Sequence, residues 1–220
     1  MSNYAVKIFS RFERFWHWSQ MVLIMTLIFS GFRIHGFYQV ISFDLAVKLH
    51  TFAALALLVI WMFAVFWLFT TGDWKQYLPT KKGLFRVARY YAYGIFKNEA
   101  HPYKKTYLRK HNPLQALSYL ALKIFLFPAI WMSGLIYLTY GFWGEEVMSS
   151  TSMLMFVAII HTAAAFAIVA FVIIHVYLLT TGHGFVVHVK PMITGFDKVE
   201  LTDEEIAFLQ SNEPKNIRKE

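Results

Sequence analysis

The stretch from Thr151 to Gly182, TSMLMFVAIIHTAAAFAIVAFVIIHVYLLTTG, decides the fold class. It carries no Asp, Glu, Lys or Arg over more than the about 20 apolar residues that a helix needs to cross a bilayer. Two histidines, His161 and His175, lie fourteen residues apart within it. At about 1.5 Å and about 100° per residue, their side chains lie roughly 21 Å apart near one face of a helix. One helix thus holds two imidazoles near opposite sides of a hydrocarbon core.

Three further apolar stretches predict three more membrane helices. No charged residue occurs from Phe15 to Phe32 or from Leu49 to Gly72, and only Lys123 interrupts the run from Pro113 to Gly144. Hydrophobic residues make up 57% of the chain and charged residues 15%, which excludes an ordinary soluble protein. We therefore expect an all-α membrane protein, a bundle of four transmembrane helices at about residues 15–34, 46–70, 113–140 and 151–181.

In this interpretation residues 1–182 form the membrane domain, with a loop at 73–112, and residues 183–220 form a polar tail. The first helix is expected to remain in the protein, because its apolar segment is too long for a cleaved signal and no small-residue cleavage site follows. The chain contains no cysteine. This excludes disulfides, iron–sulfur clusters on this chain and a haem attached through cysteine.

Basic residues are distributed unevenly along the chain. The N-terminal segment, the loop 73–112 and the tail hold 18 of the 21 Lys and Arg, whereas only Arg33 and Lys48 lie at the helix ends beside the other two loops. The positive-inside rule then places both termini and the loop 73–112 in the cytoplasm, and the loops 35–45 and 141–150 in the periplasm. The net charge of +8 follows from this topology, so it does not indicate nucleic-acid binding. The pairs Lys104-Lys105 and Arg109-Lys110 suit anionic lipid headgroups.

Four histidines lie at two expected depths in the membrane. His17 lies at the cytoplasmic start of the first helix and His50 near the periplasmic start of the second. The fourth helix enters from the periplasm, so His161 lies in its outer half and His175 in its inner half. Depth therefore pairs His17 with His175 and His50 with His161, and a functional role is the default hypothesis for such intramembrane groups.

Haem suits these pairs better than zinc does. Imidazole binds both metals, but two imidazoles lack the third and fourth ligands of a structural zinc site. A six-coordinate bis-histidine haem moves single electrons and leaves no open position for oxygen or substrate. Two such haems form an electron path across the membrane.

Small residues near the ligands indicate either space for a macrocycle or close helix packing: Ser30-Gly31, Ala53-Ala54, Ala56, Ala163-Ala164-Ala165 and Ala167.

Charged and polar segments flank the helices. Arg11 and Arg14 lie within two turns of His17, where they can pair with haem propionates, with topology-setting charge as the alternative. Residues 83–96 interleave basic and aromatic side chains, which predicts an interfacial amphipathic helix or a docking site for a cytoplasmic partner. In the tail, the pattern Thr202-Asp-Glu-Glu205 can open a short helix.

These features resemble a known family, the four-helix di-haem cytochrome b subunits of nickel–iron hydrogenases, formate dehydrogenases and thiosulfate-reductase-type enzymes in bacterial membranes. The resemblance covers about residues 8–182. The matching elements are Arg14-x-x-His17-Trp18, Ser30-Gly31, His50, His111-Asn112-Pro113-Leu114, and His161-x13-His175 with Val176-Tyr177.

The resemblance implies a protein of the bacterial inner membrane with two b haems. His17 and His175 would bind the cytoplasmic-side haem, and His50 and His161 the periplasmic-side haem. It also implies a pocket for quinone (menaquinone or ubiquinone) near Asn112 and Leu114. Independently of the resemblance, His111 and Asn112 offer the hydrogen-bond donors and the proton route that a quinone carbonyl needs. A helix N-cap is the alternative role for Asn112.

Two alternative roles are open for each of three further residues. Lys123 lies about ten residues into the third helix, where it snorkels toward the cytoplasm or contacts a haem propionate or quinone. His183 and His188 are solvated cytoplasmic residues or points of proton entry. The segment from Thr180 to Phe196 is more similar to family members that work with multihaem c-type cytochromes or sulfur-compound reductases.

The leading hypothesis is an electron-transfer subunit of a respiratory oxidoreductase complex that itself carries the quinone site. It would link the quinone pool to a periplasmic redox partner, such as a hydrogenase, a multihaem cytochrome c, or a molybdoenzyme or iron–sulfur subunit. One alternative is a stand-alone di-haem quinone oxidoreductase for a small reductant such as superoxide, which Arg33, Lys48 and His35 would attract. Another is a histidine-lined metal or proton transporter, which the lack of Asp and Glu in the spans does not favour.

Overall fold

The chain folds into two compact units, each described separately below. The computed structural model describes residues 4–80, 82–97, 99, 102–103, 111–142, 151–180, 184–199 and 201–219. The four-helix unit consists of Ser19–Val65 and Ala121–His175. The terminal unit consists of Met1–Trp18, Phe66–Leu120 and Val176–Glu220.

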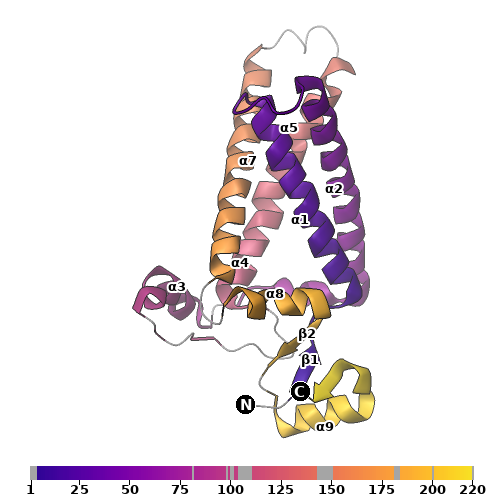
Figure 1. The fold of residues 1–220 in the computed structure, drawn as a ribbon, viewed down its shortest axis with the longest axis vertical. Helices are drawn as coiled ribbons and strands as arrows, with labels where there is room; N and C mark the ends of the chain where they lie inside the picture. The colour runs from indigo at the N-terminus through magenta and orange to yellow at the C-terminus, as the bar shows by residue number, and fades with distance from the viewer. Residues whose placement is uncertain are drawn as a thin grey trace. The chain divides into compact units, whose positions relative to one another are not determined.

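Among the described residues, four stretches of helix are long and apolar enough to cross a membrane, which confirms the predicted number of spans. They are α1 (Arg11–Ile34), α2 (Phe43–Thr71), the run from α4 (Pro113–Ala121) to α5 (Phe127–Thr139) and the short helix η4 (Tyr140–Phe142), and α7 (Thr151–Leu179). Within the four-helix unit, α1, α2, α5 and α7 lie side by side (Figure 1). Aromatic contacts join them, including Trp61 on α2 against Trp131 on α5, with ring centres 4.4 Å apart, and Phe32 on α1 against Phe166 on α7.

Side-chain caps set the beginnings of these helices. Helix α1 begins four residues earlier than the expected Phe15, because Ser10 and Glu13 form a capping box. The Glu13 backbone N–H donates to the Ser10 hydroxyl at 3.1 Å, and the Ser10 backbone N–H donates to the Glu13 carboxylate at 2.7 Å. Helix α2 likewise begins at Phe43, just after Ser42 caps the Leu45 backbone N–H.

The third span is interrupted by a π-helical segment, Leu122–Leu126, which the sequence did not predict. The Phe127 backbone N–H donates to the Leu122 carbonyl, five residues earlier. Pro128 follows directly and has no N–H to donate, so the regular hydrogen-bond ladder cannot pass through this point. The segment carries Lys123.

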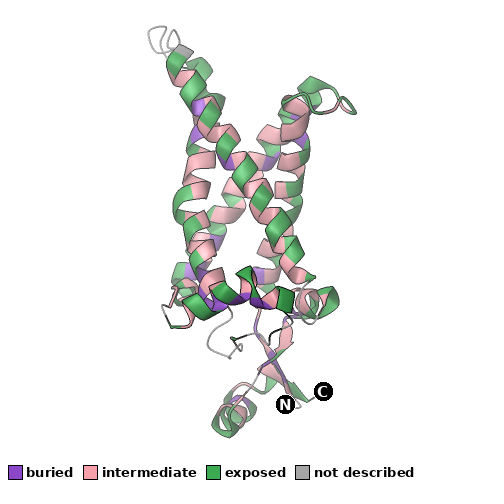
Figure 2. Ribbon diagram, turned by 90° about the vertical axis from the view of Figure 1, so that its left-hand side faces the viewer, coloured by how far each residue is buried: buried purple, intermediate pink, exposed green. Residues whose placement is uncertain are grey.

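The spans bury little of their own surface. Only 6–17% of the residues in the most apolar window of each span are buried, and exposed and half-buried residues cover most of the helices (Figure 2). A soluble bundle would bury a wide apolar stripe instead. Such exposed apolar surface suits helices that contact lipid.

In the terminal unit, the two chain ends meet in a small antiparallel sheet. The strand order is β2 (Phe196–Lys198), β1 (Tyr4–Lys7), β3 (Ile217–Lys219), and Val6 of β1 lies opposite Asp197 and Ile217. Helix α9 (Asp203–Asn212) packs on it through Leu209, which joins Val6, Ile8 and Val199 in a buried core. The predicted Thr202–Glu205 capping box is present. The sheet was not predicted, because each strand is too short to show an alternating pattern.

Helix α8 (Phe185–Thr194), also within the expected tail, docks on the start of α1. Trp18 donates its indole N–H to the Met192 carbonyl at 3.0 Å, and the Arg14 guanidinium donates to the Ile193 carbonyl. Gly195 ends α8 with φ +89°, and an added Cβ would lie 2.8 Å from the Phe9 carbonyl oxygen. Only glycine fits this junction.

The segment 83–96 forms a helix, as predicted, in α3 (Leu84–Ala92), flanked by the short helices η1 (Asp73–Tyr77) and η2 (Gly94–Lys97). Val87 and Tyr90 are buried, whereas Phe85 is 86% exposed. Several sequence predictions fall outside the described residues: the pairs Lys104-Lys105 and Arg109-Lys110, His183, the end of the fourth helix at residue 181, and most of the loop 141–150.

Leu209 is expected to hold the terminal sheet together. Leu209→Ala removes a side chain that is 0% exposed, which costs about 2–5 kcal/mol. Hydrogen exchange of the amides in β1 and α9 should then accelerate, while that of the four spans stays unchanged. Phe208→Ala, at a 54% exposed neighbour, is the control and should have little effect. Unchanged exchange in β1 after Leu209→Ala would contradict this account of the core.

Candidate functional site

Two histidines of the four-helix unit face each other across the bundle. His50 on α2 and His161 on α7 have ring centres 6.3 Å apart and ring planes at 59°. Sequence reasoning paired these two residues by depth alone. The structure brings them together although they lie 111 positions apart in the sequence.

A serine hydroxyl lies at 3.0 Å from the Nδ1 atom of each ring. Ser30 on α1 contacts His50, and Ser133 on α5 contacts His161. Each hydroxyl also lies close to a carbonyl of its own helix, Ser30 at 2.7 Å from the Thr26 oxygen and Ser133 at 2.6 Å from the Ala129 oxygen. A hydroxyl has one proton, and these carbonyls accept it. The serine oxygen therefore accepts a hydrogen bond from the imidazole Nδ1–H, which leaves Nε2 as the ring atom with a lone pair.

Small residues surround both rings. Each serine is followed by a glycine, and a Cβ added to Gly31 or Gly134 would lie 3.5 or 3.3 Å from the Cε1 atom of the adjacent histidine. On the histidine helices, the residues four before and three after each ring are buried. They are Ala46 and Ala53 on α2, and Val157 and Ala164 on α7.

The two remaining predicted ligands lie in different units. His17 belongs to the terminal unit, where its ring meets Trp18 edge-on at 5.3 Å. His175 closes the four-helix unit, where its ring stacks on Phe171 at 5.9 Å. The pairing of His17 with His175 stays a prediction.

Arg14 makes contacts that sequence reasoning did not foresee. Its Nε donates to the Ser10 carbonyl at 3.4 Å, and another nitrogen donates to the Ile193 carbonyl at the end of α8. A cation at a helix C-terminus is favourable because of the helix dipole. Arg14 thus fixes α8 against the turn of α1 that carries His17, whereas Arg11 is exposed. A propionate contact stays a prediction for both arginines.

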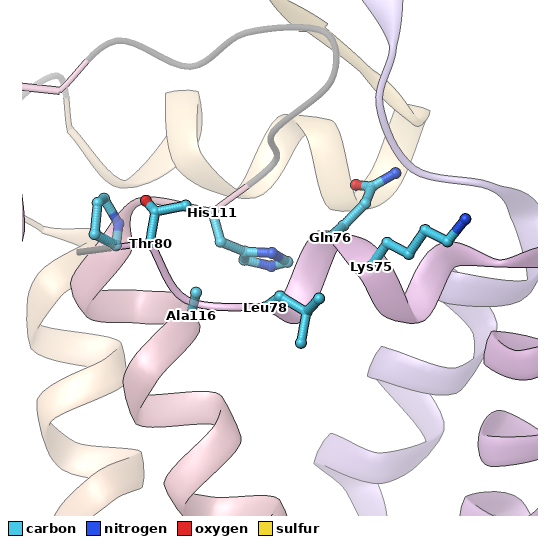
Figure 3. Close-up of a pocket in the computed structure, with 7 residues that line it drawn as sticks. Lys75, Gln76, Leu78, Thr80, His111 and Ala116 are labelled. Atoms are coloured by element: carbon cyan, nitrogen blue, oxygen red, sulfur yellow. The ribbon is translucent and has the colours of Figure 1, made fainter. Parts of the chain in front are cut away.

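A cavity of about 190 Å³ lies in the terminal unit at the start of α4. Its lining residues are Lys75, Gln76, Leu78, Thr80, His111, Pro113 and Ala116. Figure 3 shows the His111 ring extending toward Leu78 and Gln76. The same ring lies 5.1 Å from both Tyr77 and Tyr119, measured between ring centres. The cavity therefore combines an imidazole, a hydroxyl and an amide with apolar walls.

Asn112 has the structural role that the sequence left open. Its Oδ1 accepts from the Gln115 backbone N–H at 2.8 Å, and its own backbone N–H donates to the Gln115 side chain, which makes a capping box for α4. Its amide nitrogen donates to the Tyr91 hydroxyl at 3.2 Å, and the side chain is buried. Neither Asn112 nor Leu114 is among the cavity-lining residues, whereas His111 is.

Comparison with known proteins agrees with these features. The family model of prokaryotic cytochrome b561 matches residues 8–195. The chain belongs to the prokaryotic cytochrome b561 family. It is also 29% identical over 198 residues to "Putative cytochrome YdhU" of Escherichia coli (strain K12), an alignment that covers 88% of this chain and 75% of that protein. No solved structure matches the chain.

Family membership makes this chain a multi-pass cytochrome of the inner membrane that binds haem b and transfers electrons. His50 and His161 are the residues that would hold such a haem, and their ring-centre distance of 6.3 Å fits this role. Imidazole nitrogens bind a metal at about 2 Å, so two rings that bind one iron would have their centres about 6 Å apart. Among the described residues no group of three or more His, Cys, Asp or Glu is arranged to hold a metal ion. A porphyrin would supply the other four ligands that two imidazoles lack.

Sequence reasoning missed several residues of these sites. The histidine rings of the cytochrome contact Ser30 and Ser133. The sequence singled out Ser30, as a small residue and as part of the family resemblance, but not Ser133. The repeated pair Ser-Gly, at 30–31 and 133–134, was a usable signal. Lys123 lies half-buried in the π-helical segment, and its role stays a prediction.

Tyr77 is expected to make the cytochrome sensitive to alkali. Desolvation, and then the Glu13 carboxylate, raise the pKa of Tyr77 above its ordinary value. Above about pH 10 the unfolded chain loses this proton and the folded chain keeps it, so the free energy of unfolding falls as the pH rises, by about 1 kcal/mol per pH unit. Tyr77→Phe should flatten this alkaline decline.

The measurement is denaturant unfolding in detergent between pH 8 and 11, followed by circular dichroism. Tyr93→Phe, at a 54% exposed side chain, is the matched control. Equal alkaline slopes for the wild type and Tyr77→Phe would show that Tyr77 does not carry the effect.

Proposed function

We propose that this cytochrome carries electrons between a periplasmic redox partner and the membrane quinone pool through two bis-histidine haems. The observation that carries the proposal is the pair of His50 and His161, with ring centres 6.3 Å apart and both Nδ1 atoms bonded to serines. A six-coordinate haem iron supplies one-electron transfer without a free position for oxygen. His50 and His161 would hold the outer haem through Nε2.

The second haem would be held by His17 and His175. His175 follows His161 by fourteen residues on the uninterrupted helix α7, which corresponds to about 21 Å along the axis. Two centres at that separation would lie near the two surfaces of a core about 30 Å thick. The indole and guanidinium contacts of Trp18 and Arg14 to α8 would keep the His17 turn in place.

The orientation would place the terminal unit in the cytoplasm, because both chain ends and the basic loop 73–112 belong to it. The α1–α2 loop would then face the periplasm. It holds only residues 35–42, too few to house a redox centre, so another chain must bring or remove electrons there. The partner would be a hydrogenase, a multihaem cytochrome c, or a molybdoenzyme or iron–sulfur subunit. The same parts serve either direction of electron flow.

Quinone would bind in the cavity at the start of α4. His111 would donate a hydrogen bond to a quinone carbonyl and pass it a proton from the cytoplasmic side. Thr80 and Gln76 offer further polar groups, and Leu78 and Ala116 offer apolar walls. Asn112 would support this site indirectly, by capping α4.

A stand-alone oxidoreductase for superoxide gains no support from the outer surface. Lys48 forms an ion pair with Asp44 at 2.7 Å, so a neighbouring carboxylate offsets its charge. Arg33 donates to the Ile41 carbonyl at 2.6 Å. The pairing of Lys48 with Asp44 weakens the attraction of a small anion at that position.

Haem stoichiometry tests the proposal. The purified wild-type protein should contain two low-spin b haems per chain. His50→Ala and His161→Ala should each remove one and the same haem, and His17→Ala and His175→Ala the other, since a single imidazole does not hold the group in place. Redox-difference spectra and pyridine haemochrome assays measure this. His188→Ala, on α8, is the control and should retain both. One haem per chain in the wild type would refute the proposal.

Substitutions at the cavity test the quinone site. His111→Phe keeps an aromatic ring between Tyr77 and Tyr119 but removes the donor, so the KM for a soluble quinol should rise roughly two- to tenfold. Asn112→Ala should instead lower the free energy of unfolding by about 1 kcal/mol through the lost cap. Steady-state quinol oxidation, with haem reduction as the readout, measures the first effect. An unchanged KM for His111→Phe would exclude this cavity as the quinone site.

A further inference from the structure

His50 and His161 lie in surroundings of the same composition. We call each set a half-site: a Ser-Gly pair on one helix and, on the next helix, a histidine with small buried residues four before and three after it. The first half-site is Ser30, Gly31, Ala46, His50 and Ala53, and the second is Ser133, Gly134, Val157, His161 and Ala164. The serine-to-ring distance is 3.0 Å in both.

Both serines are buried and held in one orientation. Ser30 is 0% exposed and Ser133 is 4% exposed. Each hydroxyl lies within hydrogen-bond distance of the carbonyls four and three residues earlier in its helix, so its lone pairs are left for the imidazole. The carbonyl three residues earlier, at Leu27 or Ile130, is a further backbone partner of the ring. A hydroxyl that already donates is a better acceptor, because hydrogen bonds in a chain polarise one another. The chain of bonds runs from the imidazole N–H through the serine to the helix backbone.

This arrangement constrains the rings in two ways. The bond at Nδ1 selects the tautomer in which Nε2 has the lone pair. The adjacent glycine leaves room for the ring edge, since a Cβ at residue 134 would press on His161 at 3.3 Å. A partner on the far nitrogen also makes an imidazole a stronger electron donor to the metal it binds.

We infer that Ser30 and Ser133 are positioning residues that lower the reduction potential of the outer haem and fix its ligand rings. The inference rests on the proposed function, because it takes His50 and His161 as the ligands. A more strongly donating imidazole favours the ferric state over the ferrous state. Loss of the serine acceptor should therefore raise the potential of this haem and leave that of the other haem unchanged.

The test is a redox titration of the purified full-length cytochrome with Ser30→Ala and Ser133→Ala. The outer haem is identified beforehand as the one that His50→Ala removes. At the wild-type midpoint potential, each variant should raise the ratio of reduced to oxidised outer haem by about threefold, which is about 28 mV at 59 mV per tenfold. The double variant should show a larger shift in the same direction.

The chain offers matched controls on the same helices. Thr26 on α1 and Thr139 on α5 also donate to carbonyls four residues earlier, at 2.9 and 2.8 Å, without an imidazole partner for the hydroxyl. Thr26→Val and Thr139→Val should leave both potentials unchanged. Electron paramagnetic resonance of the oxidised protein gives a second readout, because the low-spin signal depends on the angle between the ligand planes, here 59°.

The outcomes separate the two proposals. Wild-type protein with fewer than two b haems refutes the proposed function, whatever the serines do. With two haems present, a shift or loss confined to the outer haem in the serine variants supports the inference. Unchanged potentials and spectra, or equal shifts in the threonine controls, overturn it.

If an alanine variant loses both haems, the variants Ser30→Cys and Ser133→Cys test the inference instead. Sulfur is a weaker hydrogen-bond acceptor of similar size, so each cysteine variant should shift the potential of the outer haem by a smaller amount in the same direction.

Discussion

The hydrogen bond from an imidazole N–H to a buried serine is the interaction on which the outer site depends. In a bilayer core no water is available, so every polar group must find its partner within the protein. His50 and His161 meet this requirement through Ser30 and Ser133, whose own protons go to helix carbonyls. The remaining nitrogen is available to a metal.

The same arrangement explains why the helices pack as they do. Small residues at Ala53 and Ala164, three after each histidine, are buried, whereas bulky neighbours on the outer faces are exposed. Glycines at 31 and 134 let the histidine rings approach the helices that carry the serines. Of the two interpretations that the sequence left open for the small residues, close helix packing agrees with the burial of Ala53 and Ala164. Space for a macrocycle stays a prediction.

The terminal unit has a different physical basis, a small buried core between a sheet and a helix. Its core of Val6, Ile8, Val199 and Leu209 joins the first strand of the chain to elements more than 190 residues later. Helix α8 then docks on α1 through Arg14 and Trp18, on either side of the turn that carries His17. The chain ends thereby constrain the start of a membrane span.

The sequence alone determined the four spans, the pairing of His50 with His161 and the capping box at Thr202, because each depends on local pattern, length or spacing. The tertiary structure alone decided the sheet between the chain ends, the serine partners of the rings, the docking of Arg14 on α8 and the cavity beside His111. Each of these joins residues far apart in the chain, and no local periodicity encodes a partner on another helix. Asn112 illustrates both kinds of feature. Its capping of α4 is a local motif that the sequence can show, whereas its contact with Tyr91 depends on the fold. Apolar periodicity identifies a span, but only packing selects which polar side chains meet inside it.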